Sequence, residues 1–150
     1  LQHLCEACMN GWDDLDEWFD EIVEDELKAA KTQAGDAFLK AVTSPTTFQD
    51  FSHITSAGGF TPVLSGNLLA NTEVGVNRAP DGINSAEDDS GKETYFDGSV
   101  KVRSAGAWDK IYFVNATPYN IQAEFEGWAR TQPYRYWQLS YNNMLEAIKK

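Results

Sequence analysis

The chain has 150 residues, of which 42% are hydrophobic and 13% aromatic, a composition that suits one domain, 1–150, with an ordinary core. Its 23 acidic and 12 basic side chains give a net charge of −11, which argues against binding nucleic acid through phosphates. There is no run of about 18 apolar residues and no secretory pattern, so we expect no membrane-spanning helix and no export signal.

Residues 1–12 are expected to form an N-terminal arm or a short helix, because their apolar residues recur at helical spacing. His3, Cys5 and Cys8 could begin a zinc site. Such a site needs about four ligands, and no second pair of cysteines or histidines follows. The alternative is that both cysteines lie on a packed face as small apolar side chains.

A long helix is predicted from Asp14 to Val42, where Pro45 stops it. Its apolar residues fall on one broad face, which we expect to pack. Residues 13–26 hold nine acids and no lysine or arginine. The acids taken as a candidate functional face are Glu17, Asp20, Glu21 and Glu24. This face is either a solvated surface that aids solubility or a surface that repels DNA.

The middle of the chain alternates loops and strands. Residues 43–60 are predicted to be a loop with aromatic anchors. Within 61–77, apolar side chains at every second position from Leu68 to Val76 predict a strand. Residues 78–98 are predicted to be an acidic loop, which is either a solvent-exposed excursion or a partner-binding loop. Residues 99–103 alternate weakly, and residues 110–115 are predicted to form a buried strand that we expect to pair with 68–76.

The C-terminal part is predicted to contain a short helix at 119–126, a loop at 127–133 and an amphipathic helix that includes Trp137 and Tyr141. Several aromatic residues exceed what the loops of a small monomer usually bury. The candidates for contacts between subunits or with a neighbouring protein are Phe48, Phe51, Phe60, Trp128 and Trp137.

Two short motifs carry a family resemblance. Thr-Pro-Val-Leu-Ser-Gly-Asn-Leu at 61–68 and a hydrophobic strand that ends in Asn, followed by Pro-Tyr, resemble the neck or tail-component proteins of long-tailed bacteriophages. The matching residues are Thr61, Pro62, Val63, Gly66, Leu68, Asn115, Pro118, Tyr119, Gly127 and Pro133. The family's glutamate two residues before the glycine is replaced here by Phe125, which lies between Glu124 and Glu126.

The resemblance implies a structural virion protein that takes part in tail completion or head-tail joining and is assembled in the host cytoplasm. It implies a homo-oligomeric ring in the neck, with DNA in its lumen. An adaptor or head-completion protein would lie on the capsid side, and the tail terminator or tail tube on the other. No sequence-specific contact with nucleic acid and no membrane partner are implied.

The residues themselves assign no catalytic, cofactor or metal site. His53 has no recognisable nucleophile partner, and the chain lacks a Gly-x-Ser-x-Gly elbow and a phosphate-binding glycine loop. Two alternatives remain open: an acidic soluble enzyme such as a carbohydrate hydrolase, or a sugar-binding module that uses the C-terminal aromatics. The predicted fold is α+β, with a long N-terminal helix on a small, mainly antiparallel sheet, a short helix and a C-terminal helix.

Overall fold

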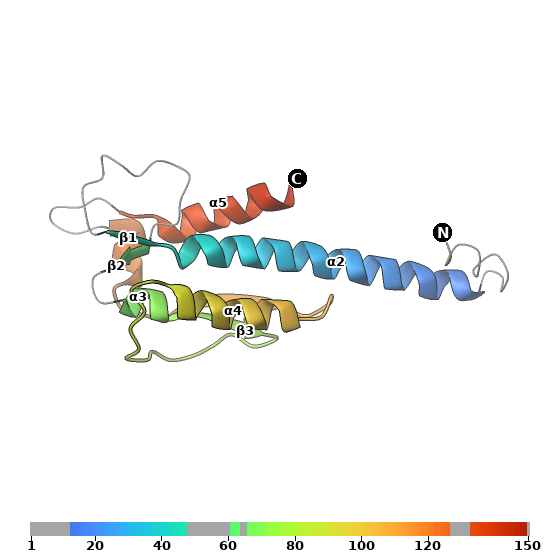
Figure 1. The fold of residues 1–150 in the computed structure, drawn as a ribbon, viewed down its shortest axis with the longest axis horizontal. Helices are drawn as coiled ribbons and strands as arrows, with labels where there is room; N and C mark the ends of the chain where they lie inside the picture. Colours follow the sequence, from blue (N-terminus) through green and yellow to red (C-terminus); the bar gives the residue numbers. More distant parts are fainter. Residues whose placement is uncertain (1–12, 48–60, 64–65, 127–132, 150) are drawn as a thin grey trace.

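The computed structural model describes residues 13–47, 61–63, 66–126 and 133–149 (Figure 1). In chain order the elements are α2 (Asp13–Val42), β1 (Pro45–Thr47), β2 (Thr61–Val63), α3 (Asn67–Ala70), β3 (Thr72–Val76), α4 (Lys92–Ser104), β4 (Ile111–Asn115), the π-helix η2 (Gln122–Glu126) and α5 (Tyr136–Ile148). The predicted α+β class is confirmed.

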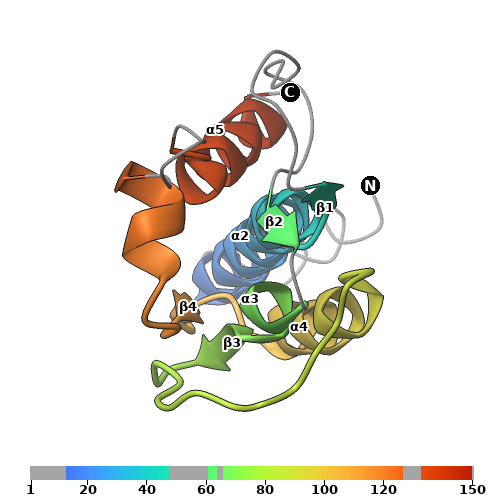
Figure 2. The same cartoon turned by 90° about the vertical axis from the view of Figure 1, so that its left-hand side faces the viewer.

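The long helix organises the molecule. Figure 2 looks nearly along α2 and shows α5 on one side of it and α4 on the other, with β3 and β4 beside α4. The core lies where the C-terminal half of α2 meets these elements. It contains the buried side chains Phe38, Leu39, Val42, Leu68, Val74, Val102, Ala123, Tyr134 and Tyr136. The predicted single long helix over 14–42 is confirmed.

The main sheet is a two-stranded antiparallel ladder. β3 pairs with β4 from Thr72 opposite Asn115 to Val76 opposite Ile111, which confirms the predicted pairing of these two segments. β3 begins at Thr72, later than predicted, because Leu68 and Leu69 belong to the short helix α3, where they are buried. β1 and β2 form a separate parallel pair, so the segment predicted to be a loop at 43–60 begins with a strand.

Helix α4 corrects the prediction for 78–98 and 99–103. Its first residue is Lys92, so the loop excursion is shorter than expected and the weakly alternating segment is helical. The residues that α4 turns inward are Tyr95, Gly98, Ser99 and Val102, at the spacing of one helical face. Gly98 and Ser99 carry almost no apolar surface, so the hydrophobic pattern does not show this face.

Both C-terminal helices occur where the sequence predicts them. The short helix is a π-helix in its second part, and α5 covers the predicted amphipathic segment. Its apolar stripe is less buried than expected, because Tyr141 and Ile148 are exposed. In the part of the chain that the structure describes, no helix is both long and apolar enough to cross a membrane.

Candidate functional site

The N-terminal half of α2 extends past the ends of α4 and α5 (Figure 1). We call residues 17–26 of this half the acidic extension. Glu17, Asp20, Glu21 and Glu24 are all exposed on it. The predicted packing of the apolar face is wrong here, because Phe19, Ile22 and Val23 are 53%, 42% and 47% exposed. Among the described residues, the body of the domain reaches the extension at Glu24, near its C-terminal end.

The turn after α4 marks where the body begins to hold α2. Trp108 donates its indole N–H to Glu24 at 3.0 Å. About two turns further on, the ammonium of Lys31 donates to the carbonyls of Gly106 and Ala107, each at 2.9 Å, and to that of Asp109. These contacts fix the direction in which the extension leaves the domain.

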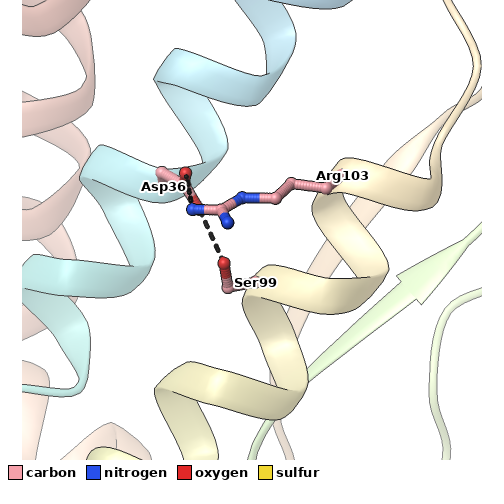
Figure 3. Close-up of polar contacts among 3 residues, drawn as sticks. All are labelled: Asp36, Ser99 and Arg103. Carbon is pink, nitrogen blue, oxygen red and sulfur yellow. Dashed lines mark hydrogen bonds and ion pairs between the residues drawn. The ribbon is translucent and has the colours of Figure 1, made fainter.

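A second polar contact fixes α2 against α4 (Figure 3). One carboxylate oxygen of Asp36 accepts from the Ser99 hydroxyl at 3.1 Å, and the other pairs with the Arg103 guanidinium at 3.0 Å. At Gly35 a Cβ would lie 2.7 Å from a methyl group of Val102. The glycine therefore permits a close helix contact, and α2 continues unbroken through it.

Three residues of the family resemblance, Leu68, Asn115 and Tyr119, meet at one junction. Asn115 is buried and donates its side-chain amide to the Leu68 carbonyl at 2.7 Å, while its amide oxygen accepts from Thr117. The Tyr119 hydroxyl donates to Asn67 at 2.8 Å. The two contacts join the end of β4 and the segment after it to α3, so these side chains have a structural role.

Gly66 has a structural requirement of its own at this junction. Its φ of 75° is left-handed, and a Cβ there would lie 2.5 Å from the backbone nitrogen of Asp89. Thr61, Pro62 and Val63 form β2, while Pro118 is exposed and Pro133 is half-buried. Gly127 lies outside the described residues.

Glu124 is a buried acid whose role the sequence does not reveal. Its two carboxylate oxygens accept the backbone N–H groups of Trp137 and Gln138 at 2.8 and 3.0 Å. These groups lie in the first turn of α5, where N–H groups have no partner within the helix. Glu124 therefore caps the N-terminus of α5 from a separate helix, and both of its carboxylate oxygens are used in this structural role.

A groove of about 260 Å³ lies beside this cap. Ile121, Phe125 and Tyr141 line it with exposed apolar surface, and Trp137 is half-buried against the core. Trp137 is thus accessible in part, as a contact residue requires. The other candidate contacts, Phe48, Phe51, Phe60 and Trp128, lie outside the described residues, as do His3, Cys5, Cys8 and His53.

An acidic cleft of about 290 Å³ lies between β3 and α4. Asp88 is buried there and accepts from the Thr94 backbone at 2.9 Å. Burial alone would raise the pKa of Asp88, but hydrogen bonds from Thr94, Ser90 and Gly91 outweigh it and lower that pKa. The carboxylate caps α4. Across the described ranges, no three acids, histidines or cysteines are placed to hold a metal ion.

Comparison with family models, curated proteins and solved structures returns no match to this chain.

Proposed function

We propose that this chain is a structural protein of a tailed-phage particle that forms a homo-oligomeric ring in the neck, between the head-completion proteins and the tail. Its role is non-catalytic, and DNA passes through the lumen of the ring. The motifs at 61–68 and 111–119 suggest this class, and Leu68, Asn115 and Tyr119 join them at one structural junction. The side chains of Asn115 and Tyr119 at this junction hydrogen-bond within the fold. A structural role for the residues of the resemblance suits an assembly protein.

The acidic extension is the observation that carries the proposal. It projects from the domain with an uncovered apolar stripe and four exposed acids on its other sides. Uncovered apolar side chains favour contact with another protein surface. The adjacent acids repel one another and destabilise the helix by a few tenths of a kcal/mol per pair. A helix that only needs to be solvated does not require so many like charges.

A position at the wall of a DNA channel would give this electrostatic destabilisation a use. Carboxylates along the wall repel phosphates, whereas a basic wall would gain affinity by releasing counterions at each contact. Screening limits this repulsion to about 8–10 Å at physiological salt. The proposal therefore places Glu17, Asp20, Glu21 and Glu24 at the wall of the lumen. The groove at Trp137 offers a second surface for a neighbouring protein.

Native mass spectrometry of the purified chain tests the ring. We expect a closed oligomer of one defined copy number that persists on dilution into the low micromolar range. A chain that is monomeric at every concentration, including concentrations of hundreds of micromolar, would contradict the proposed ring.

A further inference from the structure

The apolar stripe of the acidic extension is exposed in the part of the chain that the structure describes. Phe19, Ile22 and Val23 follow the i, i+3, i+4 spacing of one helical face, and all three are exposed. Isolated helices shorter than about 12–15 residues are marginal in water, and most helical stability in proteins comes from packing an apolar face. The extension cannot fold back onto its own α4, because α2 is an unbroken helix that leads away from it (Figure 1).

A second uncovered stripe lies on α4. Phe96 and Val100 are 67% and 54% exposed, with Lys92 one turn before Phe96 and Arg103 about one turn after Val100. These four residues, which we call the α4 face, occupy positions i, i+4, i+8 and i+11 and therefore lie along one side of the helix.

The charge around the α4 face is opposite to that of the whole chain. A groove of about 420 Å³ between the end of α2 and the start of α4 adds Lys40 beside Lys92. The acids of α4, Glu93 and Asp97, line the cleft towards β3 together with Lys101, and Glu93 borders the α4 face on that side, seven residues before Val100. On the side towards α2, Asp36 is paired with Arg103, so Lys40 and Lys92 supply the cations of this face that are not in that ion pair.

The extension and the α4 face match in chemistry and in length. Both present large apolar side chains, one among acids and the other among bases. The extension spans about 14 Å and α4 about 18 Å, at about 1.5 Å per residue. Glu26 lies within the apolar arc of the extension and is exposed, so a cation opposite it would satisfy its charge.

We propose that the acidic extension of one copy packs on the α4 face of a second copy. The contact is head-to-tail, so every copy gives one extension and receives one, and a rotation that closes produces a ring. Docking through Phe19, Ile22 and Val23 leaves Glu17 and Glu21 on the opposite side of the helix, free to line the lumen. Glu24 lies on that side too and keeps its hydrogen bond from Trp108 of its own domain, while Asp20 lies at the edge of the contact. The inference rests on the proposed ring and specifies its interface.

Two double variants test the contact because a head-to-tail interface can be complemented. Phe19→Ser with Ile22→Ser disables the extension, and Phe96→Ser with Val100→Ser disables the α4 face. All four side chains are exposed within the chain, so both variants should retain the wild-type circular dichroism. Ile83→Ser, on an exposed apolar residue between β3 and α4, is the matched control.

Sedimentation velocity then measures assembly. Each double variant alone should be monomeric, with a dissociation constant raised about 100-fold, taking about tenfold for each large apolar side chain removed from the interface. An equimolar mixture of the two should form a 1:1 dimer, because one intact extension meets one intact α4 face. The control should assemble like the wild type. Assembly should also weaken as salt rises, because exposed charges are screened.

The outcomes separate this interface from the ring itself. A wild-type oligomer that survives either double variant overturns the interface and leaves the ring standing. Monomeric variants whose mixture stays monomeric show that the two stripes contact other surfaces or another protein, which also overturns it. A wild-type chain that never assembles overturns both the ring and the interface.

Discussion

Replacing Glu124 should destabilise the domain more than any exposed acid, because its carboxylate caps α5 from a distance. Glu124→Ala removes two hydrogen bonds at 2.8 and 3.0 Å and leaves two N–H groups of a first helical turn without that partner. A hydrogen bond to a charged group contributes about 1.5–3 kcal/mol. We therefore expect a loss of about 3 kcal/mol in the free energy of unfolding, or about 6–12 °C in Tm.

Glu124→Gln should lose about half of this amount, since its amide offers one acceptor oxygen in place of two. Urea unfolding followed by circular dichroism and by tryptophan fluorescence gives the free energies. Glu126→Ala is the matched control, because Glu126 is exposed in the same π-helix, and it should change stability by less than about 0.5 kcal/mol. Equal losses for Glu124→Ala and Glu126→Ala would refute the capping role.

Two further perturbations test the core. Asn115→Ala should cost about 2–3 kcal/mol in urea unfolding, because the buried Leu68 carbonyl and Thr117 hydroxyl lose their partner; a neutral result would contradict the junction. Burial, with the neighbouring Glu124 carboxylate and Tyr119, raises the pKa of Tyr136 well above its usual value. Unfolded tyrosine loses its proton near pH 10 while the folded side chain keeps it, so stability should fall by about 1.4 kcal/mol per pH unit above about 10. In Tyr136→Phe this alkaline loss should be smaller, and an unchanged slope would show that Tyr136 does not cause it.

The sequence predicts the elements whose signal lies in apolar side chains. The long α2 and the pairing of β3 with β4 follow from periodicity over many residues. Helix α4 does not follow in this way, because two of its inward positions are Gly98 and Ser99, whose packing depends on close approach to Leu39 and on a hydrogen bond to Asp36. Val100 and Val102 suggest a strand instead, although Val100 faces solvent and Val102 faces the core.

At the candidate site, periodicity predicts the apolar face but not which part of it is covered. Periodicity correctly identifies Phe19, Ile22 and Val23 as one apolar face, but it cannot tell how far the body of the domain extends along α2. That boundary is set by long-range contacts such as Trp108 with Glu24 and Lys31 with the turn after α4. The cap formed by Glu124 joins positions 13 and 14 residues apart, and no local pattern encodes it.

The central claim is that the acidic extension lines a DNA channel, and a density map of the assembled phage neck tests it most directly. We expect Glu17, Asp20, Glu21 and Glu24 to face the lumen of the ring, within about 8–10 Å of the DNA path. Plain solubility would instead place these four acids on the outer rim. Acids on the outer wall together with a neutral or basic lumen would show that the acidic extension does not line the channel.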